Sequence, residues 1–150
     1  MGDHHDLGGR EHRSDEVPIH TVRVNSFHMS KTETTNQQYC EFLNSAAARN
    51  TIIVKEGLVY TTDGKTLLCD THRSDSACSI TWDGDSFAVV KNRENHPVVC
   101  IRWHGAAAYC NWLSEQARSG GLGVPLPEGY VARLPAEEEW ERAVRGTDGA

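Results

Sequence analysis

Long hydrophobic runs are missing from the sequence. The apolar stretches at residues 98–101 and 106–110 are among the longest in the chain, whereas a helix that spans a membrane needs roughly 18 to 20 apolar residues. Basic residues are also scarce, because 15 Lys and Arg stand against 21 Asp and Glu, with a formal net charge of −6 and no cluster of cations. Phosphate backbones are bound through clustered cations. The composition therefore argues against a membrane protein and against a nucleic-acid partner.

The cysteines form no CxxC pair, and one thiol is left over if the others pair. Cys69 and Cys78 stand nine residues apart across a polar stretch, so they could bridge or stay free. The absence of a visible export signal favours free thiols and a cytoplasmic location. The other three are expected to pack as small hydrophobic side chains rather than to act in catalysis: Cys40, Cys100 and Cys110.

The rest of the chain is organised around residues 96–113, within a length that suits one soluble domain. Residues 98–101 are a run of β-forming apolar residues, which predicts a buried strand. Pro97 can precede this strand but cannot lie within it, because proline donates no backbone hydrogen bond. The apolar period then becomes that of a helix, with one face that predicts a core helix: Ala106, Tyr109, Cys110 and Leu113. On local grounds, His104 and Cys110 are only weak catalytic candidates.

Two further elements are expected before residue 50. Val22 and Val24 alternate with polar residues, so the stretch Val17 to Met29 predicts a half-buried strand. Thr35 and Gln38 have the spacing of a capping box, which predicts a helix that runs to about Ala48. Its inward face is spaced as a helix requires: Tyr39, Phe42, Leu43, Ala46 and Ala47.

Short strands are expected between residues 52 and 90. Asp63-Gly64 and Asp83-Gly84 are each flanked by β-forming residues, and such steps supply the positive φ that tight hairpins need. We therefore expect two hairpins. Asp83 and Asp85 could be proposed as calcium ligands, but two carboxylates without further oxygen ligands in register make a turn the better interpretation.

The last part of the chain predicts a surface connection and a third helix. Four glycines and two prolines between Ser119 and Gly129 exclude regular structure there. A helix is then predicted at about residues 136–145. Glutamates stand in its first turn, arginines stand in its last turn, and a glycine follows it. Its expected buried face is Trp140, Ala143 and Val144. Glu137, Glu138 and Glu139 match the helix dipole more simply than they form a catalytic pair.

Residues 1–16 are polar and contain no apolar period, so they predict an exposed loop. Imidazoles and carboxylates in this loop could hold a divalent metal, but nothing local fixes a coordination geometry. The solvated loop is therefore the preferred interpretation over a metal site made from Asp3, His4, His5, Asp6 and His12.

Several segments together, in this order along the chain, carry a family resemblance: residues 1–2, 15–20, 35–43, 96–99, 103–112, 133–141 and 145–146. The series resembles the signature of the sulfatase-modifying-factor family, which is the family of formylglycine-generating enzymes. The resemblance covers nearly the whole chain. It leaves extra hairpins at about residues 50–92 and a loop at about residues 115–131 as insertions.

The resemblance implies an α+β fold of the formylglycine-generating-enzyme type, related to C-type lectin folds and poor in regular secondary structure. It also implies a copper-dependent oxidase that converts a sulfatase cysteine to formylglycine, with calcium ions holding the scaffold. The implied partner is a sulfatase-like peptide or protein.

The family's chain normally continues beyond Arg145-Gly146 into calcium-binding segments and a closing cysteine pair that binds copper. None of these follows here, so we expect residues 1–150 to be the truncated N-terminal portion of a single domain, inactive alone. No catalytic, cofactor-binding or metal residue is assigned within it. Some relatives have a disulfide cysteine at the position of Cys110, whose partner would lie in the absent half.

The family also contains members that do other work. Two alternatives to the oxidase therefore stay open: a non-catalytic binding or interaction module, and an iron-dependent relative that resembles the sulfoxide synthases.

Overall fold

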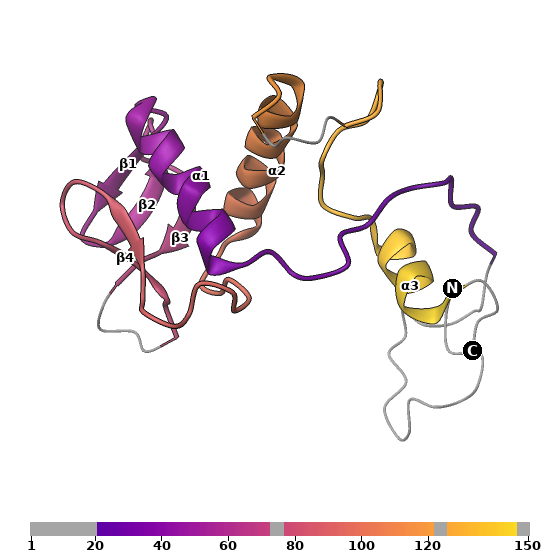
Figure 1. Cartoon of the computed structure of the whole chain (residues 1–150), viewed down its shortest axis with the longest axis horizontal. Helices are drawn as coiled ribbons and strands as arrows, with labels where there is room; N and C mark the ends of the chain where they lie inside the picture. Colours follow the sequence, from indigo (N-terminus) through magenta and orange to yellow (C-terminus); the bar gives the residue numbers. More distant parts are fainter. Residues whose placement is uncertain (1–20, 73–76, 122–125, 147–150) are drawn as a thin grey trace. The chain divides into compact units, whose positions relative to one another are not determined.

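The structure, a computed structural model, describes residues 21–72, 77–121 and 126–146. It is an α+β fold in which the described chain forms three helices and five short strands. The chain separates into two units, residues 32–134 and the combination of residues 1–31 with 135–150. Each unit is described by itself below (Figure 1).

The first helix of the larger unit, α1 (Asn36–Ala48), begins as its capping box predicts. The Gln38 N–H donates to the Thr35 hydroxyl at 3.3 Å, and the Thr35 N–H donates to the Gln38 side chain at 2.9 Å. The predicted inward face is confirmed, with Ala47 partly buried and these four side chains buried: Tyr39, Phe42, Leu43 and Ala46.

Two small antiparallel sheets follow α1. The first has the order β1-β2-β3 and the second pairs β4 with β5. The strand bounds are β1 (Ile52–Lys55), β2 (Leu58–Thr61), β3 (Leu67–Asp70), β4 (Ile80–Trp82) and β5 (Phe87–Val89). Both predicted hairpins are confirmed, because β2 pairs with β3 and β4 pairs with β5. A third hairpin, β1 with β2, was not expected.

The turns explain which hairpins the sequence revealed. Gly64 and Gly84 have φ values of +70° and +111°, as the Asp-Gly steps predicted. The Asp83 carboxylate accepts the N–H groups of Asp85 and Ser86 at 2.9 and 2.8 Å, and these bonds lower its pKa. The turn interpretation of Asp83 is therefore confirmed.

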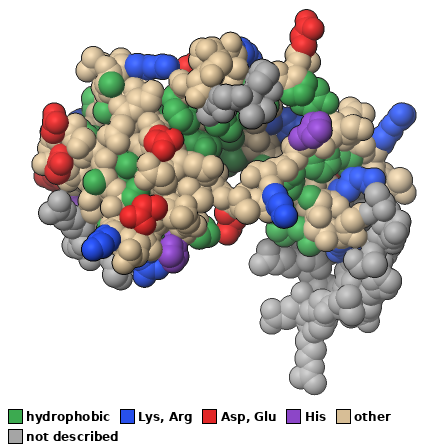
Figure 2. All heavy atoms as spheres, in the orientation of Figure 1, with side chains coloured by type: hydrophobic (Ala, Val, Ile, Leu, Met, Phe, Trp, Pro, Cys, Tyr) green, Lys and Arg blue, Asp and Glu red, His purple; other side chains and the backbone are tan. Residues whose placement is uncertain are grey.

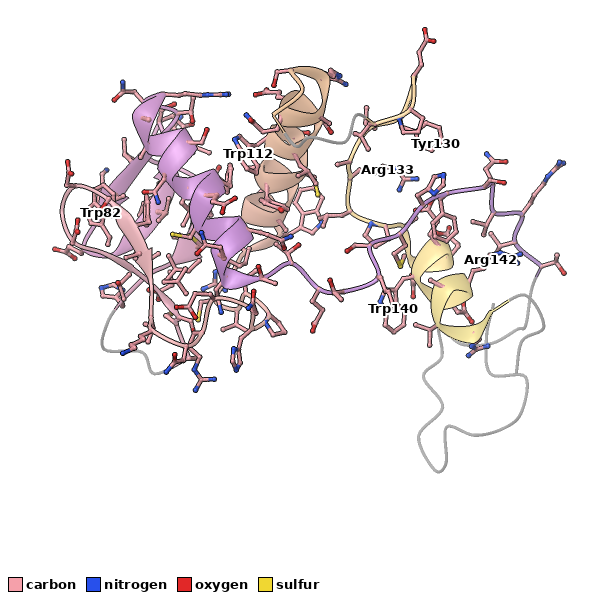
Figure 3. The ribbon with its side chains drawn as sticks, viewed as in Figure 1. Trp82, Trp112, Tyr130, Arg133, Trp140 and Arg142 are labelled. Atoms are coloured by element: carbon pink, nitrogen blue, oxygen red, sulfur yellow. The ribbon has the colours of Figure 1, made fainter. Side chains whose placement is uncertain are left out.

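Helix α2 (Trp103–Arg118) packs beside α1, and both lie against the sheets, as Figure 1 shows. Four rings from the two helices meet with centroids 5.2 to 5.9 Å apart: Tyr39, Phe42, Tyr109 and Trp112. The Trp112 indole N–H also donates to the Ser45 hydroxyl at 3.0 Å between the helices (Figure 3). The predicted core helix is confirmed.

The buried face of α2 differs in part from the predicted one. Tyr109 is buried, but Ala106, Cys110 and Leu113 are only partly so. Gly105, Ser114 and Ala117 are buried with Tyr109 instead. Ser114 is buried because its hydroxyl accepts the Ala132 N–H at 2.8 Å, which holds the following segment against the helix.

Within the described residues, no helix has both the length and the hydropathy needed to cross a membrane.

The Asn44 side chain makes two of the hydrogen bonds that attach β5 to α1. The Asn44 side-chain N–H donates to the Phe87 carbonyl at 3.0 Å, and the Phe87 N–H donates to the Asn44 carbonyl oxygen at 2.8 Å. The amide thus satisfies both backbone groups of Phe87, as a neighbouring strand would. The Cys40 thiol donates to the same carbonyl at 3.3 Å.

The strand predicted at residues 98–101 is wrong. The segment makes only isolated bridges, Pro97 with Thr35 and Ile101 with Cys69. Cys100 has a φ of +64°, a left-handed conformation that interrupts an extended strand. Val99 is 48% exposed, so the segment is not fully buried.

The half-buried strand predicted between Val17 and Met29 is also wrong for the part that is described. Residues 21–29 form no strand, and residues 17–20 lie outside the described residues. The predicted alternation is present, because Val22 and Val24 are partly buried between exposed neighbours. A strand also needs a neighbour for its backbone hydrogen bonds. None of the described strands pairs with this segment.

Helix α3 (Glu137–Arg145) has the predicted bounds, and Gly146 follows it with a φ of +72°. Its predicted buried face is wrong, since Trp140 and Val144 are 58% and 66% exposed. The other described residues of its unit, 21–31, contain no helix or strand that could cover this face. Figure 3 shows Trp140 on the outside of α3, and Figure 2 shows hydrophobic side chains at the surface there.

The surface connection predicted between Ser119 and Gly129 is loop in its described parts. Gly120 and Gly129 have positive φ there.

The start of α3 offers a test by substitution. The Ala136 N–H donates to the Glu139 carboxylate at 2.8 Å, so half of a capping box is present. Alanine lacks the oxygen that would accept a helix N–H in return. We expect Ala136→Thr to supply it and to raise the free energy of unfolding by roughly 0.5 to 2 kcal/mol. A thermal melt with an unchanged or lower midpoint would count against this placement of the helix start.

The exposed apolar side chains generate a second prediction. The α1 face is buried within the chain, but the large side chains of Trp103, Trp140 and Val144 are between 58% and 67% exposed. Such surfaces promote association. We expect the 150-residue chain to bind a hydrophobic dye and to self-associate, and the double substitution Trp140→Gln with Val144→Gln to reduce both. A monodisperse monomer that binds no dye would show the expectation to be wrong.

Candidate functional site

The structure places both catalytic candidates weighed from the sequence on α2. His104 is exposed in the first turn of α2, where its ring packs edge-on against Trp103 at a centroid distance of 5.1 Å. Cys110 is partly buried further along α2, and burial raises the pKa of its thiol. A raised pKa disfavours the thiolate that nucleophilic catalysis needs.

The structure brings a different set of residues together where β3 meets the segment before α2. The Arg102 N–H donates to the Leu68 carbonyl at 2.8 Å, and the Asp70 N–H donates to the Cys100 carbonyl at 3.0 Å. Between these bonds, Cys69 lies opposite Ile101. This short antiparallel pairing is the contact through which α2 is attached to the sheet.

Two buried polar groups face each other at this contact. Tyr39 and Cys69 are each 1% exposed, and the Tyr39 hydroxyl lies beside the Cys69 thiol without making a well-formed hydrogen bond. Burial raises the pKa of Cys69 to about 12, although the Tyr39 hydroxyl lowers it; the charges of Asp70 and Cys100 raise it further. Burial likewise raises the pKa of Tyr39. Both groups are therefore neutral near pH 7. We refer to Tyr39, Cys69 and Cys100 as the Tyr–Cys cluster.

Gly105 is the reason that α2 can approach this cluster so closely. A Cβ atom at position 105 would overlap the Leu68 carbonyl oxygen and would lie 2.7 Å from the Tyr39 hydroxyl. The hydroxyl is thus enclosed by the backbone of α2 on one side and by β3 on the other. This arrangement excludes water from the Tyr39 hydroxyl and the Cys69 thiol, and it leaves Cys100 as the partly exposed member of the cluster.

Asn36 is a second buried polar residue whose role is structural. Its side-chain N–H donates to the Arg93 carbonyl and its backbone N–H to the His96 carbonyl, both at 2.9 Å. The side-chain oxygen of Asn36 has no hydrogen-bond partner. The residue fixes residues 93–96 against the start of α1.

One imidazole and carboxylate pair lies at the end of β3. The Asp70 carboxylate contacts both His72 Nδ1 and the His72 N–H, at 3.0 and 2.8 Å. The pair is partly exposed and belongs to a local turn. Across the described ranges, no three His, Cys, Asp or Glu side chains gather as a metal site would require. The candidate ligands among residues 3–12 lie outside the described residues.

The cysteines are placed differently from the expectation in two respects. Cys69 lies in β3 and not in a polar loop, and it forms no disulfide with Cys78. Cys40 is buried as expected, whereas Cys100 and Cys110 are only partly buried. Sequence spacing did not connect Cys69 with Cys100, since 31 positions and a whole hairpin separate them.

Comparison with known proteins gives a family match over almost the whole chain. The model described as "Sulfatase-modifying factor enzyme 1-like domain" matches residues 2–150. Similar proteins include the "Formylglycine-generating enzyme" of Streptomyces coelicolor, 28% identical over 142 residues that cover 87% of this chain and 40% of that enzyme. The mouse "Formylglycine-generating enzyme" is 27% identical over 146 residues, with 87% and 34% covered.

A relative of another kind matches at similar identity. The "Serine/threonine-protein kinase pkn1" of Chlamydia caviae is 25% identical over 139 residues, which cover 93% of this chain and 17% of the kinase. The chain therefore spans less than half the length of each of these three relatives. No solved structure matches the chain significantly.

The close approach of α2 to β3 at Gly105 predicts whether a Gly105→Ala substitution raises or lowers the free energy of unfolding. In an open helix position, Gly→Ala would stabilise by roughly 0.5 to 1 kcal/mol. Here the added methyl group would overlap the Leu68 carbonyl, so we expect Gly105→Ala to lower the free energy of unfolding by roughly 1 to 3 kcal/mol. Chemical denaturation measures the change, and Ala107→Gly controls for helix propensity. A more stable Gly105→Ala variant would refute the described approach of α2 to β3.

Proposed function

Since the chain belongs to the family of sulfatase-modifying factor enzyme 1-like domains, we propose that it is the N-terminal portion of a formylglycine-generating oxidase. Its substrate is then a sulfatase or sulfatase-like peptide, in which one cysteine is converted to formylglycine. The observation that carries the proposal is the match over residues 2–150 together with the 40% and 34% coverage of two formylglycine-generating enzymes.

The copper that the family resemblance implies does not fit the described thiols. A Cu(I) site of the expected kind needs two thiolates close together. Cys69 and Cys100 lie on adjacent segments, but among the described residues no three His, Cys, Asp or Glu side chains gather as a metal site. Burial also raises the pKa of Cys40, Cys69 and Cys110, which disfavours the thiolate form. We infer that the copper ligands of the complete enzyme lie outside this chain, and we derive no catalytic step from its own cysteines.

The implied calcium ions find no group of three His, Cys, Asp or Glu side chains among the described residues, and the two Asp-Gly carboxylates serve another purpose. Asp63 accepts the Thr61 hydroxyl and the Lys65 N–H, and Asp83 accepts two turn N–H groups. Each of these carboxylates therefore stabilises a hairpin turn. The proposed contribution of this chain is the scaffold of α1, α2 and the small sheets.

A second function, a non-catalytic interaction module, is favoured by one specific observation. The kinase relative matches over 93% of this chain, so a similar segment occurs in a protein whose printed name is that of a kinase. The exposed side chains of Val99 and Trp103 offer apolar surface for such a role. The coding sequence on both sides of this chain separates the two proposals. Two closely spaced cysteines near the end of a longer frame favour the oxidase, and their absence favours the interaction module.

The oxidase proposal predicts that the 150-residue chain has no activity alone. The chain is incubated with copper, oxygen and a peptide that contains the sulfatase-type Cys-x-Pro-x-Arg sequence, and the peptide mass is followed. We expect no aldehyde above a blank that contains only the metal, while the Streptomyces coelicolor enzyme serves as the positive control. Turnover that Cys100→Ser or Cys110→Ser abolishes would overturn the proposal and assign an active site to this chain.

A further inference from the structure

Two thiols from distant parts of the sequence lie on adjacent antiparallel segments. Cys69 in β3 is directly opposite Ile101. The hydrogen bonds that flank this pair make it a non-hydrogen-bonded pair, the type with the shorter Cα separation of about 4.5 Å. Cys100 adjoins Ile101, so its Cα is expected about 5 to 6 Å from that of Cys69. Disulfides join residues whose Cα atoms are about 4.4 to 6.8 Å apart.

The backbone at Cys100 also departs from the alternation of a regular strand. In an extended strand, residues 100 and 101 would point to opposite faces, and the Cys100 thiol would turn away from Cys69. Cys100 instead has a φ of +64°. The left-handed backbone therefore does not hold the Cys100 side chain on the face opposite to Cys69.

The two thiols differ in their access to solvent. Cys69 is 1% exposed, whereas Cys100 is only partly buried. Cys100 is therefore the thiol that a dissolved reagent meets first. The buried Cys69 is shielded from such a reagent, so its role in the pair is to resolve an adduct formed on Cys100.

We propose that Cys69 and Cys100 are a redox-responsive thiol pair, which a low-molecular-weight disulfide such as oxidised glutathione converts to an intramolecular disulfide. The Cys100 thiolate attacks one sulfur of the reagent, the S–S bond of the reagent breaks, and the released thiolate takes up the Cys100 proton. The neutral Cys69 thiol then loses its proton as its sulfur attacks the Cys100 sulfur of the mixed disulfide, and the second reagent thiolate is displaced and takes up that proton. Two protein thiols are oxidised, and one reagent disulfide is reduced to two thiols.

The bond would lock the attachment of α2. It joins β3 to the segment that leads into α2, across the same short pairing that holds the helix on the sheet. It also closes a loop that contains β4 and β5, which limits the conformations open to the unfolded chain. This proposal is independent of the oxidase reaction and requires no metal.

The reduced 150-residue chain, in dilute solution, is treated with oxidised glutathione, blocked at its remaining thiols and digested without reduction. We expect a linked pair of peptides that contain Cys69 and Cys100, and an intact chain lighter by two hydrogen atoms. The midpoint of thermal unfolding should rise by on the order of 10 °C. Cys100→Ser should remove both effects, and Cys110→Ser, which removes another partly buried thiol, should retain them.

The peptide map of the unsubstituted chain decides the pairing by itself, so the result does not depend on whether Cys100→Ser folds. A link from Cys69 to Cys78 would overturn the proposal. So would a glutathione adduct on Cys100 that never resolves, or a chain whose thiols stay fully reduced.

Discussion

The short antiparallel pairing of residues 68–70 with 100–102 is the contact on which the larger unit depends. It consists of two backbone hydrogen bonds and the pair of Cys69 opposite Ile101. It nevertheless sets where α2 begins and which side of α2 meets the sheet. Gly105 allows the helix backbone to reach the Leu68 carbonyl, and the aromatic rings of α1 and α2 then fill the remaining core. Few backbone contacts therefore position much of the buried apolar surface.

Local signals predicted the elements that depend on local chemistry. The capping box at Thr35, the Asp-Gly turns and the charged ends of α3 each satisfy backbone groups within a few residues, so their sequence pattern is sufficient. The β1–β2 hairpin escaped prediction because its turn places Glu56 at a positive φ beside Gly57, and glutamate is not a signal for that conformation. The strand at residues 98–101 failed because nothing local marks Cys100 as left-handed.

Burial and the candidate site depend on distant residues, and there sequence patterns were insufficient. The apolar face of α3 was correctly identified as apolar, but a pattern cannot supply the surface that covers it. The Tyr–Cys cluster draws one residue each from α1, β3 and the segment before α2, so no sequence spacing indicates it. The family, in contrast, was predictable, because many short motifs in a fixed order carry information that no single motif has.

The attachment of β5 to α1 through Asn44 has a consequence for how this fold accommodates change. A strand that joins a sheet through a ladder is held at several points, but the β4–β5 hairpin receives its two Phe87 bonds from one amide side chain. The Asn44 rotamer therefore helps to set the direction in which the hairpin leaves α1, together with the Cys40 thiol and the buried Ile80 and Phe87 side chains. Positions of the β4–β5 hairpin outside these contacts can diverge in sequence while the helices keep their packing, whereas Asn44, Ile80 and Phe87 are constrained together.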